Sequence, residues 1–343
     1  MKKIIILIVM LNAEMNLSAQ NVGIGTTTPE FKLDVKNGSI NTDSVYRIGG
    51  FTITSIKGID NLFIGHDAGV NNTGNSNLAA GYRALGSYSA NLPGSSNVAV
   101  GAYAHLNNLT GNRNTAVGSF ALANTTSSEY NTAVGYHAGI ANNHGYNNVF
   151  VGANTNTNGD GYFNVIAIGQ GTVVAGSSRA FFGNPATNQY AGWAGWSTFS
   201  DGRFKTNVQE NVPGLSFINQ LRPVTYRIKA TALNDFLHKG AATDLTGETN
   251  AFYVKALKEK EAITYTGFIA QEVEEAARKT GFDFSGVHSP SNEKDNYALS
   301  YAEFVVPLVK AVQEQQQMIE ALQKENKEQR EMIEKLITIV EKK

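Results

Sequence analysis

Residues 114–135 read NTAVGSFALANTTSSEYNTAVG, a segment that begins and ends with the same five residues, Asn-Thr-Ala-Val-Gly. Similar short runs recur on both sides of it, and each run closes on a glycine. Most of the closing glycines follow one another at intervals of 17 residues. A fixed period of this length indicates a repeat architecture, in which each unit buries its apolar face only by stacking on its neighbours. The closing glycines are Gly65, Gly81, Gly101, Gly118, Gly135, Gly152 and Gly169.

Each repeat predicts one short β-strand, because a β-rich run is bounded by Asn and Gly and followed by a cluster of turn residues. The apolar residues are mostly Ala and Val, so the interior of the repeat region must be narrow. We therefore expect a mainly β repeat shaft over residues 61–195. Two architectures satisfy the pattern: a β-solenoid made by one chain, and an intertwined trimeric β-roll in which three chains share a thin core.

Composition excludes several classes of protein. The chain has 343 residues, which is long enough for two domains, and its formal net charge is −1, so no basic field indicates a nucleic-acid partner. Cysteine is absent, which excludes a disulfide scaffold and a cysteine-ligated metal site. Four histidines in the repeats lack ligand spacing, so we predict that they are solvated surface residues and that the protein has no metal and no cofactor. They are His66, His105, His137 and His144.

The first 19 residues are typical of a secretory signal peptide. Lys2 and Lys3 precede the apolar run 4–11, and small residues end the segment at Ser18-Ala19. The run is too short to span a bilayer, and no later run is apolar enough for a membrane helix. We predict an exported protein that is extracellular or at the cell surface. A buried N-terminal strand is the alternative, and residues 20–60 are expected to form an N-terminal β segment.

Charged residues become frequent after about residue 196, and we expect a small α+β domain over residues 196–304. Within it, residues 231–262 have little pattern and look like an insertion. The elements expected around it are a helix over 215–221, a strand over 224–228, a strand over 265–269 and a helix over 271–279.

A heptad pattern over residues 305–343 predicts a coiled coil. The pattern alone does not decide between a dimer and a trimer, and a lone helix packed on its own domain is the alternative. Polar core residues are expected to fix the register at a cost in stability. Positions a are Val305, Val312, Ile319, Asn326, Ile333 and Val340, and positions d are Leu308, Gln315, Leu322, Gln329 and Leu336.

Four motifs stand in order in the C-terminal half: WSTFSDGRFKTNV at 196–208, LRPVTY at 221–226, GFIAQEV at 267–273 and LSY at 299–301. Over about residues 199–320 this order resembles the peptidase S74 family, the intramolecular chaperone domain at the C-terminus of phage tail spikes and endosialidases. The repeats resemble the heads of trimeric bacterial adhesins and the shafts of tail fibres. The family's opening motif is met by Ser200, Asp201, Arg203, Lys205 and Asn207.

The resemblance implies a homotrimer that folds and then cuts its own chain between Phe199 and Ser200, with Ser200 as nucleophile and Lys205 as general base. A Ser-Lys pair can do this chemistry without histidine, provided that the lysine is neutral, which partial burial or the nearby Arg203 would favour. Residues five apart meet only where the chain turns, and we expect Gly202 to permit that turn. Asp201 and Arg203 are expected to hold it by a salt bridge.

Other interpretations stay open at this point. Ser200 or Asp201 alone can be the N-cap of a short helix. The domain can trimerise a structural or adhesive surface protein without cutting it. A glycan hydrolase ranks last, because the carboxylates of the repeats are isolated. A glycan or another cell-surface ligand of the shaft is conceivable, but the sequence does not identify one. The isolated carboxylates are Asp67, Glu129 and Asp160.

Overall fold

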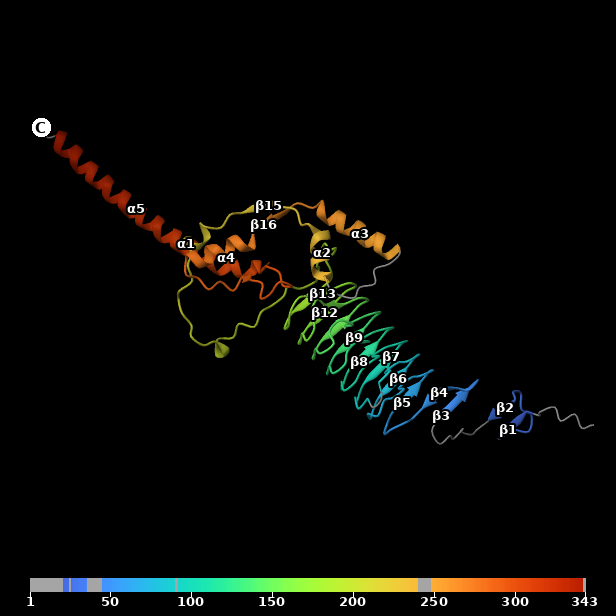
Figure 1. Ribbon diagram of the computed structural model, residues 1–343. Coiled ribbons are helices and arrows are strands. Elements are labelled where there is room, and N and C mark those ends of the chain that lie inside the picture. The colour runs from blue at the N-terminus through green and yellow to red at the C-terminus, as the bar shows by residue number, and fades with distance from the viewer. Residues whose placement is uncertain (1–20, 25, 36–44, 90–91, 240–247, 342–343) are drawn as a thin grey trace, which may run out of the picture.

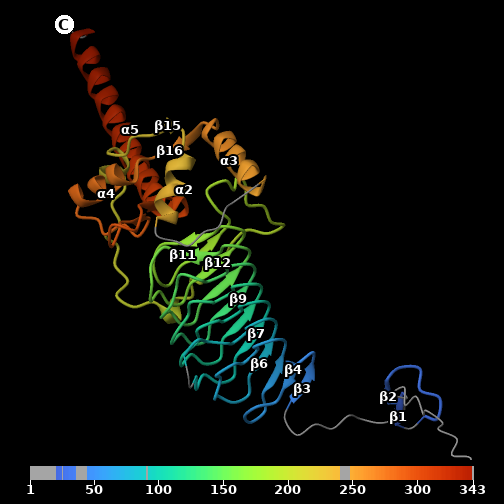
Figure 2. The ribbon, with the colours of Figure 1, turned by 45° about the vertical axis from the view of Figure 1, so that its right-hand side comes forward.

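The protein is described here by a computed structural model covering residues 21–24, 26–35, 45–89, 92–239 and 248–341 (Figures 1 and 2). The signal peptide predicted for residues 1–19 lies outside these residues. Two short parallel strands, β1 (Val22–Ile24) and β2 (Leu33–Val35), come first. They are followed by β3 (Val45–Ile48) and β4 (Phe51–Ser55), which pair antiparallel and begin the main sheet.

The repeats form a β-solenoid of about seven turns over residues 62–182. Each repeat contributes the strand predicted for it, and from β5 to β14 the strands of the main sheet pair in parallel in repeat order. Strands β11 (Asn156–Thr157) and β13 (Val173–Val174) form a second, two-stranded sheet. The remaining strands are β5 (Leu62–Ile64), β6 (Leu78–Ala80), β7 (Val98–Val100), β8 (Thr115–Val117), β9 (Thr132–Val134), β10 (Val149–Val151), β12 (Ile166–Ile168) and β14 (Ala180–Phe182).

A single chain closes the solenoid around its own core, so the chain adopts the first of the two expected architectures. The middle residue of each repeat strand points inward and is buried, while its two neighbours point outward. Alanines that follow the repeat glycines face these residues, which explains the small side chains in the sequence. Buried core residues include Phe63, Ala79, Ala84, Ala99, Ala104, Ala116, Ala121, Ala133, Ala138, Phe150 and Ala167.

A ladder of buried asparagines joins the turns and explains the Asn that opens each of the first six repeats. The Oδ1 atom of Asn97 accepts the backbone N–H of Asn114 at 3.0 Å, and the Oδ1 atom of Asn114 accepts that of Asn131 at 2.9 Å. The amide nitrogen of Asn114 donates to the carbonyl of Ser128 at 2.8 Å. Buried backbone groups at the corner of each turn thus find partners that the strands do not supply.

The repeat glycines are required by close approach of successive turns. Gly135 has a φ of 138°, and a Cβ atom placed on it would lie 2.6 Å from the carbonyl carbon of Gly152 in the next turn. An L-residue rarely adopts this φ, and the contact is far too short for a real side chain. The glycine at this point in the period is therefore a steric requirement of the solenoid.

After the solenoid, the elements predicted for the C-terminal region are present with slightly different ends. The apolar core of this region contains buried Phe217, Val273, Phe284 and Phe304. The predicted elements are α1 (Leu215–Ile218), β15 (Val224–Tyr226), β16 (Tyr265–Gly267) and α4 (Ala270–Lys279). Two short strands that were not predicted follow, β17 (Val287–His288) and β18 (Ala298–Leu299).

The supposed insertion at residues 231–262 is better ordered than the sequence pattern predicts. It contains α2 (Ala230–His238) and α3 (Glu248–Glu261), which contact each other. Both views place α2 at the β13 end of the solenoid (Figures 1 and 2), where it contacts β13. The segment therefore belongs to the packed structure at the end of the shaft.

The long terminal helix α5 (Val305–Glu341) packs against α1 near its start and then projects away from the other elements (Figure 1). Among its described residues only Pro307 and Ala311 are buried. It is thus not a helix packed along its own domain, and its heptad positions lie exposed in this single chain. Within the described residues, no helix combines the length and apolar character needed to cross a membrane.

Candidate functional site: the Ser200–Lys205 turn

The structure brings Ser200 and Lys205 together. The Lys205 Nζ atom lies 2.7 Å from the Ser200 Oγ atom, within hydrogen-bond distance. Both residues stand on the long loop between β14 and α1, which runs outside the packed elements (Figure 1). The chain therefore turns between the two residues, as expected for side chains that are five positions apart and meet.

A short 3₁₀ helix, η1 (Gly202–Phe204), makes this turn. The Asp201 carboxylate is its N-cap and accepts the backbone N–H of Arg203 at 2.9 Å. The same carboxylate accepts a hydrogen bond from the Arg203 Nη2 atom at 2.6 Å, which lowers the pKa of Asp201. The salt bridge expected between Asp201 and Arg203 is therefore present, and Asp201 is also the N-cap of a short helix, which was the other interpretation of this motif. Gly202 is not at a positive φ, so the turn does not depend on glycine's extra freedom there.

The surroundings of the pair are exposed and unusually apolar. Every residue from 188 to 211 is exposed in the single chain. Phe199, which precedes Ser200, and Phe204, within the turn, are exposed at 105% and 84%. Large apolar side chains gathered in water are typical of a surface that binds a protein, a membrane or a ligand. Trp193 and Trp196, exposed at 107% and 94%, extend this apolar surface toward the shaft.

Chemically, the arrangement places an amine beside a hydroxyl. A neutral lysine amine at this distance can take the proton of Ser200 as the oxygen attacks a carbonyl. Water screens an exposed lysine, so the pair needs a drier setting to work as nucleophile and base. The side chains that can provide this setting are the exposed aromatic residues next to it.

The four repeat histidines were considered as possible metal ligands. No group of three potential ligands that could hold a metal ion exists among the described residues. The prediction that all four are solvated is wrong for His105, which is fully buried, and burial lowers its pKa to about 3. It occupies the same point of the period as the buried Leu85 and Leu122, and this alignment is the signal that sequence reasoning missed.

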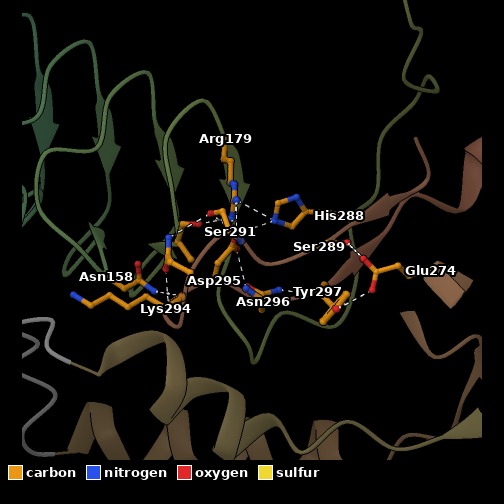
Figure 3. A network of polar contacts seen from close by, with 12 residues as sticks. Asn158, Arg179, Glu274, His288, Ser289, Ser291, Lys294, Asp295, Asn296 and Tyr297 are labelled. Atoms are coloured by element: carbon orange, nitrogen blue, oxygen red, sulfur yellow. Dashed lines mark hydrogen bonds and ion pairs between the residues drawn. The ribbon is translucent and has the colours of Figure 1, made fainter. Parts of the chain in front are cut away.

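A second polar site was not predicted (Figure 3). Arg179, just before β14, meets Asp295 of the loop between β17 and β18, with Nη1–Oδ1 and Nη2–Oδ2 distances of 2.6 and 2.8 Å. The Asp295 side chain is only 1% exposed. The guanidinium of Arg179 holds the pKa of Asp295 far below its usual range. This pair joins the last turn of the shaft to the C-terminal region.

Residues 200–282 match the family Peptidase_S74, described as chaperone of endosialidase. The match begins at Ser200 and covers α1, β15, β16 and α4, and it confirms the resemblance inferred from the motifs. It includes about a quarter of the chain. No curated protein and no solved structure matches the chain.

Proposed function

We propose that this chain is an exported trimeric fibre whose S74-type domain assembles three copies and then cuts each chain once between Phe199 and Ser200. Ser200 is the nucleophile and Lys205 the general base. The domain that acts extends over residues 196–304, with residues 305–343 as a coiled coil. The observation that carries the cutting step is the 2.7 Å contact between Lys205 Nζ and Ser200 Oγ at the first residue of the family match.

The family match supports the chaperone role, because it covers a domain described as a chaperone. The repeats explain why such help is needed. Near-identical turns can pair out of step with little loss of contact, so the register must be set from outside the repeat. A folding domain at the C-terminal end of the shaft is suited to this task.

The outward face of the main sheet supports assembly through the shaft. Its residues are apolar or Thr, and no charged side chain stands at an outward position from β5 to β12. Several of these side chains, such as Val134 and Ile168, are exposed at 40% and 37%. A continuous apolar strip of this kind is rare on a monomer and is typical of a surface that a partner covers.

The terminal helix supports assembly at the other end of the chain. Its a and d positions form an apolar stripe whose members are exposed in the single chain, including Val312 at 63% and Leu336 at 59%. A stripe with a repeat of seven residues is buried when helices wind around one another. Trimer formation also brings the exposed aromatic residues of three loops together, which supplies the drier setting that the Ser200–Lys205 pair needs.

Expression of matched single variants tests the cutting step. The purified parent should separate into two pieces on a denaturing gel, whereas Ser200→Ala should give one intact chain. Lys205→Ala should block or greatly slow the cut, and Lys205→Arg should not restore it, because a guanidinium stays protonated. Ser197→Ala, in the same exposed loop, is the control and should cut normally.

The alternative is a structural or adhesive surface protein in which the same domain trimerises the chain and stays covalently attached. The exposed position of Ser200 and Lys205 in the single chain favours this alternative, if assembly does not cover them. An intact parental chain that sediments as a trimer would establish it. A monomer at all concentrations would contradict both functions.

A further inference from the structure

The C-terminal domain covers the open end of the solenoid. The last turn of a repeat protein has no following turn to bury its apolar residues, so solenoids need a cap. Here α2 supplies Leu237, which is buried together with Val173 and Ala175 of the last turns. Leu233 and Phe236, on the same helix, pack against them. The helix that looked like an insertion thus completes the shaft core.

A second contact lies beside the first. Ala186, after the last strand, packs against a cluster formed by Ala230, Tyr253 and Leu257 of α2 and α3. The Tyr253 hydroxyl donates to the Oδ1 atom of Asn234 at 2.8 Å, and burial raises the pKa of Tyr253 to about 12. The side chains at this contact are therefore largely shielded from solvent.

The polar network of Figure 3 is the third contact. Asp295 is held by Arg179 from the shaft and by the backbone N–H groups of Ser291 and Asn296 at 3.0 and 2.8 Å. The His288 Nε2 atom lies 3.0 Å from the Oδ2 atom of Asp295. Every oxygen of this buried carboxylate thus has partners, which is the condition for a buried ion pair to be stable.

A fourth contact completes the set. The side-chain amide of Asn158 donates to the carbonyl of Lys294 at 2.7 Å. All four contacts join residues before Phe199 to residues after Ser200, across the bond of the proposed cut. The exposed part of the loop, residues 188–211, makes none of these contacts, so cutting the chain there leaves them intact.

We infer that residues 200–343 stay bound to the shaft after the cut, as a non-covalent cap on its end. The partner of the surface formed by α2, α3 and Asp295 is the last turn of the shaft itself. The inference rests on the proposed function, since the cap becomes a separate chain only if the cut occurs. Cutting then frees the exposed loop, and in a trimer three copies of this four-contact interface hold the cap in place.

An externally supplied cut tests the inference without relying on self-cleavage. A recognition sequence for a specific protease is placed between Gly195 and Trp196 in the full-length Ser200→Ala chain. After digestion, gel filtration at neutral pH should show both pieces in one peak. Pieces that separate as soon as the loop is cut overturn the inference. A parental chain that never cuts itself contradicts the proposed function and leaves this result unaffected.

Two variants then test the residues that carry the contact. In the digested chain, Asp295→Asn leaves Arg179 without its carboxylate and should speed dissociation by about 100-fold, as expected when one member of a buried ion pair is removed. Leu237→Ser should also speed dissociation by exposing Val173 and Ala175. Glu272→Gln is the control, because its pair with Arg222 lies wholly within the domain. Asp295→Asn and Leu237→Ser complexes that dissociate at the parental rate overturn the inference.

Discussion

Replacing Asn114 by Ala should weaken the solenoid far more than its small change in volume implies. Asn114 is fully buried, and its side chain accepts the N–H of Asn131 and donates to the carbonyl of Ser128. Alanine leaves both backbone groups buried without these partners. Each buried polar group without a partner costs about 1–3 kcal/mol, so the free energy of unfolding should fall by about 2–6 kcal/mol for the two groups.

The measurement is urea unfolding of the uncut Ser200→Ala chain, followed by circular dichroism at fixed protein concentration. Thr115→Ala is the matched control, since Thr115 is the next residue and lies on the outward side of β8. The Thr115→Ala substitution should lower the free energy of unfolding by no more than about 1 kcal/mol, which is the usual span of β-strand propensities. If the Asn114→Ala and Thr115→Ala chains unfold at the same urea concentration, the asparagine ladder does not stabilise the shaft.

Three further outcomes follow from the structure. Gly135→Ala should destabilise the shaft by at least about 2 kcal/mol through its positive φ and its clash with the next turn. Gly161 shares a positive φ, 74°, but its Cβ would have free space, so Gly161→Ala should lower the free energy of unfolding by less. Ile333→Asn should weaken the trimer by about 1.5–3 kcal/mol per chain, read by sedimentation, whereas Glu334→Asn next to it should not. The lowered pKa of Asp295 means that its ion pair contributes fully above the usual Asp range and is lost as the pH falls below about 4. The cut complex should therefore come apart faster in gel filtration at pH 3 than at pH 7, and a digested chain carrying Asp295→Asn should lose part of this acid dependence.

The repeats were predictable because the sequence repeats its structural requirements. The Asn that opens the first six runs serves the ladder, the Ala at the middle of most strands fits the narrow core, and the Gly that closes the run permits contact between turns. Each is a local requirement that recurs every turn, so one sequence without relatives is enough to reveal it. The need for a turn between Ser200 and Lys205 was predictable in the same way, from spacing alone.

The cap was missed because its contacts join distant parts of the chain. Arg179 and Asp295 are 116 residues apart, and nothing local in either segment identifies the other. Helix α2 did carry a signal, since Leu233, Phe236 and Leu237 have the spacing of one helix face. The sequence analysis took residues 231–262 as an insertion with little pattern, and the surface that α2 covers, the end of the solenoid, is created only by folding.

The most direct test of the central claim is the N-terminal sequence of the smaller piece of the purified parental protein. We expect it to begin Ser200-Asp201-Gly202, and we expect the Ser200→Ala chain to yield no such piece. A start at any other residue, or normal cutting of the Ser200→Ala chain, would contradict a cut made by Ser200 and Lys205.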